Sequence, residues 1–191
     1  LIQYAAEEAI AAGATELIFI TGKHKRSIED HFDKAYELEA ELEARNKIAI
    51  LDAIQGILPK GVSCIYIRQA EALGLGHAVL CAKPVVGNEP FSVILADDLI
   101  DAQAPVIQQM VDLYNEKGCS ILGVEDVAHE DTAVYGIVDA TPISDAILSI
   151  NSIVEKPKPA EAPSNLAVVG RYILTSKIFD CLEKVHPGSG G

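Results

Sequence analysis

Gln69 stands where an apolar run ends and a glycine-punctuated turn begins, in the segment RQAEALGLGHAV. An amide side chain offers both a donor and an acceptor, so it can read the edge of a nucleotide base. Gly74 in the same turn would let the backbone come close to a flat ligand. The alternative is an ordinary tight turn with an exposed glutamine, and these residues by themselves favour it.

Two adjacent carboxylates, Asp97 and Asp98, follow the apolar run Phe91–Ala96. Carboxylates at the carboxyl end of a buried strand are well placed to hold a divalent metal, and Mg²⁺ favours hard oxygen ligands together with phosphates and water. Side chains alternate along a strand, so at most one of the two is expected to bind the metal directly. The alternative is that one carboxylate caps the next helix and the other is solvated.

A third candidate is the pair Glu155 and Lys156, which closes the apolar run 147–154 and precedes a proline. A carboxylate can accept hydrogen bonds from sugar hydroxyls, and an ammonium group can bind a phosphate as a compact charge. A surface ion pair before a loop is the alternative. Gly136 and Gly170 lie inside strand patterns, where glycine indicates either a bulge or a ligand that needs the space.

Other chemistries find little support. The five histidines have no metal-ligand spacing and receive no role, and no Ser–His–Asp or Cys–His arrangement stands out. The four cysteines are far apart without a C-x-x-C pair, which argues against zinc and predicts reduced thiols in the cytosol.

The composition limits the class of partner. The formal net charge is −13, which argues against nucleic acid and against an anionic membrane surface, because both need clustered Lys and Arg. About half of the residues, 49%, are hydrophobic, which suits a single domain with a sizeable core. No apolar run approaches the length of a membrane span. A small phosphorylated ligand remains compatible, since one or two local lysines suffice for it.

The order of elements predicts the fold class. Strands and helices alternate in the first two thirds of the chain, and a strand-rich portion follows. This order predicts a doubly wound, Rossmann-like α/β core with a mixed sheet and an added antiparallel portion. Strands are expected at 15–21, 62–68, 91–96, 120–124, 135–139, 147–155 and 166–174, and helices at 2–12, 76–82, 105–117 and 176–185.

Residues 27–56 form an acidic helical insertion in this pattern. One long helix or two consecutive helices are expected there, starting near Ser27, and its charged side is most simply a solvated face. Residues 1–191 are expected to form one domain that is incomplete at both ends, because the chain begins inside an amphipathic helix and its last residues, 186–191, form a turn.

The segments RQAEALGLGHAV, FSVILADD, YGIVD, SIVEKPKP and VVGRYIL together resemble bacterial UTP–glucose-1-phosphate uridylyltransferases (UDP-glucose pyrophosphorylases). The insertion IEDHFDKAYELEAELEARNK resembles a helical insertion typical of that family. The resemblance runs in order through essentially all 191 residues.

The resemblance implies a reaction and a set of roles. UTP and glucose 1-phosphate would give UDP-glucose and pyrophosphate, with Mg²⁺ as cofactor, no nucleic acid or membrane partner, and homo-oligomers as in the family. The implied roles are uracil contacts for Gln69 and Gly74, a metal ligand for Asp97 (Asp98 being the weaker candidate), glucose contacts for Gly136, Glu155, Val169 and Gly170, and binding of the sugar-side phosphate for Lys156.

Two family features are missing from this sequence: the glycine-rich triphosphate loop with its strand, and a later segment with a second metal-binding Asp. We therefore expect no turnover by the 191-residue chain alone, and UDP-glucose formation by it would contradict this expectation. Two alternatives remain: an enzyme of this fold that uses another nucleotide or sugar, and a non-catalytic module that binds sugar nucleotides.

Overall fold

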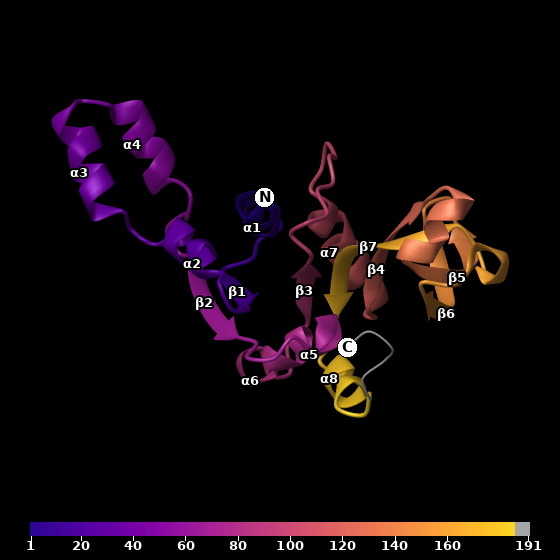
Figure 1. Cartoon of the computed structure of the whole chain (residues 1–191). Coiled ribbons are helices and arrows are strands. Elements are labelled where there is room, and N and C mark those ends of the chain that lie inside the picture. Colours follow the sequence, from indigo (N-terminus) through magenta and orange to yellow (C-terminus); the bar gives the residue numbers. More distant parts are fainter. Residues whose placement is uncertain (186–191) are drawn as a thin grey trace.

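The computed structural model describes residues 1–185; the turn expected at 186–191 lies outside this part. The described part is a mixed α/β structure, as the sequence predicts (Figure 1). Its strands are β1 (Glu16–Thr21), β2 (Ser63–Arg68), β3 (Phe91–Ile94), β4 (Ile121–Asp126), β5 (Gly136–Ser144), β6 (Ile147–Glu155) and β7 (Leu166–Leu174). Its α-helices are α1 (Ile2–Ala11), α2 (Arg26–Phe32), α3 (Tyr36–Ala44), α4 (Ile48–Gln55), α5 (Gly74–Cys81), α6 (Lys83–Val86), α7 (Val106–Lys117) and α8 (Lys177–Leu182).

The strands form two sheets. β1 and β2 pair in parallel along their whole lengths, from Glu16 opposite Ser63 to Thr21 opposite Arg68. The second sheet is antiparallel and has the order β3-β7-β5-β6, with β4 also paired to β7. β7 is its central element, because it pairs with β3, β4 and β5. The strand-rich portion expected after residue 134 is therefore confirmed.

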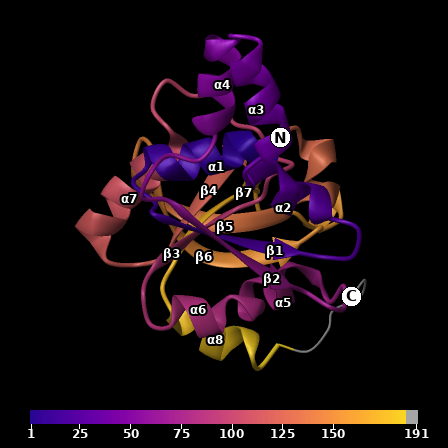
Figure 2. The same cartoon turned by 90° about the vertical axis from the view of Figure 1, so that its left-hand side faces the viewer.

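Helices cover the sheets from both sides (Figure 2). α1 and α7 lie on one side, where Ile107 and Met110 of α7 pack with Ile173 of β7. α5, α6 and α8 lie on the other side, where Phe179 of α8 stacks on Phe91 of β3 at 5.2 Å between ring centroids.

The acidic insertion is three helices rather than one or two. The chain leaves the α-helical conformation at Asp33, which is extended, and again at Asn46, whose φ of +53° is left-handed. The start expected at Ser27 is wrong by one residue, since α2 begins at Arg26 and no side chain caps it. α3 and α4 pack together as a hairpin that projects from the body at the end opposite β5 and β6 (Figure 1).

Other boundaries differ in smaller ways. α5 begins at Gly74, two residues before the predicted start, and the short α6 is absent from the sequence-based prediction. β3 ends at Ile94, so Asp97 and Asp98 lie in the turn after the strand instead of on its end. Among residues 1–185, none of the helices combines the length and the apolar character needed to cross a membrane.

Candidate functional site

Gln69 continues β2 beyond its last paired residue. Its backbone N–H donates to the carbonyl of Thr21 at 2.9 Å, which extends the parallel pairing by one step. The side chain is half-buried, and its Nε2 donates to the carbonyl oxygen of Gly74 at 3.1 Å. Nε2 also lies 2.9 Å from Nδ1 of His77 on α5. The glutamine is thus held against the turn, which differs from the exposed side chain of the alternative interpretation.

A cleft of about 790 Å³ runs between β1 and β3. The sides of α1, α5 and α7 also line it, and most of its wall is apolar. Thr21 and Leu75, which flank the Gln69 turn, line this cleft, and so does Asp97. The wall of the cleft therefore includes Asp97 and two neighbours of the Gln69 turn, whereas Gln69 and Gly74 themselves do not line it.

The turn that carries Asp97 and Asp98 is built against β7. The backbone N–H of Leu95 donates to the carbonyl of Gly170 at 2.8 Å, and the N–H of Asp98 closes the turn on the carbonyl of Leu95 at 3.3 Å. Asp97 is exposed, whereas Asp98 is partly buried. The two carboxylates therefore have different surroundings, as expected, although the cause is a turn and not strand alternation.

A buried arginine, which was not among the predicted site residues, donates hydrogen bonds to the backbone of this turn. Arg171 of β7 is 1% exposed, and its guanidinium donates to the carbonyl oxygens of Leu95 at 3.1 Å and Asp98 at 2.9 Å. Its Nε and Nη2 atoms both donate to Glu8 of α1, with distances of 2.9–3.2 Å. Glu8 also accepts the N–H of Ile107 at the start of α7. The one available signal was an arginine inside an otherwise apolar strand.

Gly170 brings β7 into contact with the acidic turn. Its φ is +67°, and it lies where β7 bulges opposite the register shift between Leu122 and Val124. A Cβ at this position would overlap Oδ2 of Asp98 and would lie 2.9 Å from Cβ of Leu95. The expected bulge is therefore present, and the space at Gly170 is taken by the side chains of Asp98 and Leu95. Val169 lies beside it, with its side chain against Gly123 of β4.

Gly170→Ala is expected to lower the free energy of unfolding by about 2–4 kcal/mol, because a left-handed alanine is strained and its methyl group must displace the acidic turn. Gly118→Ala is the matched control, since Gly118 has a φ of +65° but open space around its missing Cβ. The control should cost about 1 kcal/mol in the same urea titration. Equal losses for the two variants would contradict the packing argument.

Gly136 and Glu155 face each other across β5 and β6. A Cβ on Gly136 would lie 3.1 Å from Oε2 of Glu155, so the glycine makes room for this carboxylate. The next residue, Lys156, has a φ of +47°, and its N–H donates to the carbonyl of Tyr135 at 2.9 Å. Its Nζ is 3.8 Å from Oε1 of Glu155, and both side chains are exposed. The surface ion pair of the alternative interpretation is therefore present, and it leaves both groups accessible.

Tyr172 connects the acidic turn with this second pair of strands. Burial raises the pKa of its phenol, and the nearby carboxylates of Asp98 and Glu155 raise it further. Both carboxylates are therefore near enough to Tyr172 to act on its phenol. Tyr172 was not among the predicted site residues; its position two residues after Gly170, in the same strand, was the signal.

The predicted residues thus fall into two clusters. Gln69 and Gly74 form one, and the Asp98–Gly170–Tyr172–Glu155 group with Gly136 and Lys156 forms the other. Asp97, which precedes Asp98 in the chain, lies on the wall of the cleft that Thr21 and Leu75 also line. No hydrogen bond or ion pair within residues 1–185 joins Gln69 directly to Lys156.

The carboxylates of the acidic turn suit a metal site that is completed by substrate and water. Within the described residues, no group of three His, Cys, Asp or Glu side chains could hold a metal by itself. Mg²⁺ commonly uses one or two carboxylates and takes its remaining ligands from substrate phosphates and water. Exposed Asp97, with Asp98 next to it, fits that pattern and does not fit a closed structural metal site.

Comparison with known proteins places the chain among nucleotide-processing enzymes. The model of the nucleotidyl transferase family matches residues 1–189. A UTP–glucose-1-phosphate uridylyltransferase of Pseudomonas aeruginosa is 49% identical over the whole chain, which covers 69% of that protein. One of Staphylococcus epidermidis is 47% identical over 99% of the chain, which covers 65% of it. The chain thus spans about two thirds of the length of these relatives.

A solved structure gives the same result. The crystal structure of a UDP-glucose pyrophosphorylase complexed with UDP-glucose superposes with a TM-score of 0.89 at 43% identity. The superposition covers 99% of this chain and 69% of that one. The similarity therefore extends from the sequence to the arrangement of the elements around the cleft.

Proposed function

The chain belongs to the nucleotidyl transferase family and, within it, to the UTP–glucose-1-phosphate uridylyltransferases, and on this basis we propose that it binds UTP and glucose 1-phosphate, the substrates for conversion to UDP-glucose and pyrophosphate. The observation that carries the proposal is the acidic turn packed on Gly170 of β7, with Glu155 at the end of β6 in the same sheet and Lys156 directly after it. These groups are the types needed for a metal, a sugar and a phosphate.

In the proposed reaction, a phosphate oxygen of glucose 1-phosphate attacks the α-phosphorus of UTP. The new oxygen–phosphorus bond forms as the bond from the α-phosphorus to the bridging oxygen breaks, and that oxygen leaves with pyrophosphate. No covalent intermediate with the protein is needed, so the side chains act by positioning and by neutralising charge.

The proposed roles divide between the two clusters. Gln69 and the backbone at Gly74 would bind the uracil. Glu155 would accept hydrogen bonds from glucose hydroxyls, and the Gly136, Val169 and Gly170 backbones would line the sugar pocket. Lys156 would neutralise the sugar-side phosphate, since its ammonium group is exposed and only loosely paired.

Asp97 would hold Mg²⁺, with Asp98 as the weaker candidate. The metal, when bound, would neutralise phosphate charge during the transfer. The contribution of this chain is to keep the Asp97 carboxylate accessible at the cleft, and the Arg171 contacts to the carbonyls of Leu95 and Asp98 serve that purpose.

Two alternatives stay within reach of experiment. A non-catalytic module would bind UDP-glucose without any dependence on Mg²⁺, and an enzyme for another nucleotide would prefer dTTP or ATP to UTP. The insertion α2–α4, which resembles the one typical of the uridylyltransferases, favours the uridine nucleotide. The proposal also includes a cytosolic location, consistent with the four free cysteines, and a homo-oligomeric state.

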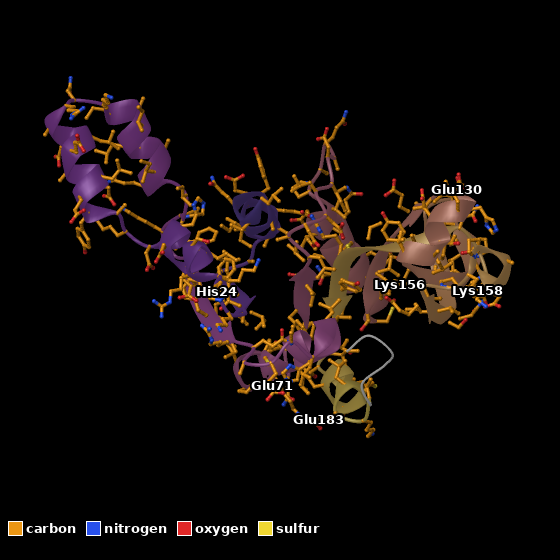
Figure 3. The ribbon with its side chains drawn as sticks, viewed as in Figure 1. His24, Glu71, Glu130, Lys156, Lys158 and Glu183 are labelled. Atoms are coloured by element: carbon orange, nitrogen blue, oxygen red, sulfur yellow. The ribbon has the colours of Figure 1, made fainter. Side chains whose placement is uncertain are left out.

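Lys156→Met is expected to weaken UDP-glucose binding about 10- to 100-fold, because a charge-assisted contact to the phosphate is lost. Lys158→Met is the matched control, since Lys158 also lies 3.8 Å from an exposed glutamate, Glu161. Figure 3 shows both lysines on the antiparallel part of the molecule. Isothermal titration calorimetry with Mg²⁺ present measures both variants, and similar losses for the two would contradict the role of Lys156.

A further inference from the structure

The amide of Gln69 is oriented by two contacts to one of its atoms. Nε2 lies 3.1 Å from the carbonyl oxygen of Gly74 and 2.9 Å from Nδ1 of His77. A backbone carbonyl can only accept a hydrogen bond, so the nitrogen end of the amide must face Gly74. The atom that faces Gly74 is therefore Nε2, because the opposite orientation would place Oε1 of Gln69 against the carbonyl oxygen.

The contact with Gln69 also determines which ring nitrogen of His77 carries the proton. Once one N–H of Gln69 is used by Gly74, the other points to Nδ1 of His77, which must therefore be the unprotonated ring nitrogen. The thiol of Cys81, one turn later on α5, lies 3.9 Å from the same Nδ1 and is a second potential donor to it. Both neighbours favour the tautomer with its proton on Nε2.

We propose that His77 is a positioning residue that sets the base preference of the proposed nucleotide site by holding the amide of Gln69. With both N–H groups engaged, only the carbonyl oxygen Oε1 remains for a ligand, and no hydrogen bond within residues 1–185 uses it. The inference rests on the proposed function, in which Gln69 binds the nucleotide base. It adds how Gln69 distinguishes one base from another.

A fixed acceptor distinguishes the two pyrimidines. Uracil carries an N–H at N3, which can donate to Oε1 of Gln69, whereas cytosine carries a lone pair at that position. A glutamine that could rotate its amide by half a turn would serve either base. Gly74 opposes this rotation at one N–H and His77 opposes it at the other, so loss of His77 should remove part of the selectivity and not all of it.

The test compares UDP with CDP by isothermal titration calorimetry on the wild-type chain and three variants. His77→Leu removes the acceptor, His77→Asn restores one through its amide oxygen, and Cys81→Ala removes only the neighbouring thiol. The ratio of CDP to UDP dissociation constants should fall about 5- to 10-fold in His77→Leu, as expected for one hydrogen bond. It should stay within about twofold of wild type in His77→Asn and Cys81→Ala.

A wild-type ratio in His77→Leu, or an equal fall in His77→Leu and His77→Asn, would overturn the proposal. Nitrogen NMR of the free wild-type chain gives a second, ligand-independent readout. His77 should show an unprotonated Nδ1 and a protonated Nε2, and the reverse pattern would overturn the proposal. If the wild-type chain binds neither nucleotide, the proposed function fails, and the NMR result still decides the orientation of Gln69.

Discussion

Replacing Arg171 by Met is expected to lower the free energy of unfolding by about 3–5 kcal/mol, the cost of leaving one charge of a buried pair without its partner. Arg171 is 1% exposed and the side chain of Glu8 is 13% exposed, so water cannot replace the lost contacts. The methionine also leaves the carbonyls of Leu95 and Asp98 without their donor. Urea unfolding followed by circular dichroism measures the change.

The exposed pair Lys83–Glu183 provides the control, because its side chains are 41% and 50% exposed. Lys83→Met should cost no more than about 1 kcal/mol, as is usual for surface ion pairs. Glu8→Gln should approach the effect of Arg171→Met, since it breaks the same pair from the other side and weakens the contact to α7. A loss below 1 kcal/mol for both core variants would show that the Glu8–Arg171 pair does not hold the turn.

The second large effect concerns the proposed metal ligand. Asp97→Asn should weaken Mn²⁺ binding, measured by electron paramagnetic resonance in the presence of UDP-glucose, by about 100-fold or more, because loss of a mere outer-shell partner already costs 10- to 100-fold. Asp97 is the exposed carboxylate on the wall of the cleft. The same variant should remove the dependence of UDP-glucose affinity on Mg²⁺.

Two matched variants separate this role from a general loss of negative charge. Asp98→Asn should weaken Mn²⁺ binding less, since its carboxylate packs against Gly170. Asp101→Asn changes an exposed carboxylate three residues further on and should have little effect. If Asp98→Asn proved the more damaging variant, the direct ligand would be Asp98, and the assignment of Asp97 would be wrong.

Much of the fold could be predicted from the sequence, because apolar runs and glycines report local structure. The apolar runs predicted strands where β1, β2 and β3 lie, and Gly118 at the end of α7 is left-handed as expected of a helix-terminating glycine. The division of the insertion into α2, α3 and α4 was not predictable in the same way. It depends on single backbone conformations at Asp33 and Asn46, which leave no periodic signal.

The residues of the candidate site also divide into those that the sequence could predict and those that it could not. Residues that present a functional group at the end of a strand, such as Gln69 and Glu155, can be identified from their type and place. Residues that act through tertiary interactions cannot be identified in this way. Arg171 is bonded to Glu8, which lies 163 positions away in the sequence, and Tyr172 comes near Asp98 and Glu155 only after the sheet has formed. His77 received no role because its importance depends on which atom of Gln69 faces it.

The central claim is that the two clusters bind the two ends of one sugar nucleotide. Nitrogen–proton NMR of the chain titrated with UDP-glucose and Mg²⁺ tests it most directly. We expect the resonances of Gln69 and Gly74, near the base, to shift together with those of Gly136 and Gly170, near the glucose. All of these shifts should give the same dissociation constant. Shifts confined to one cluster, or different dissociation constants for the two, would contradict it.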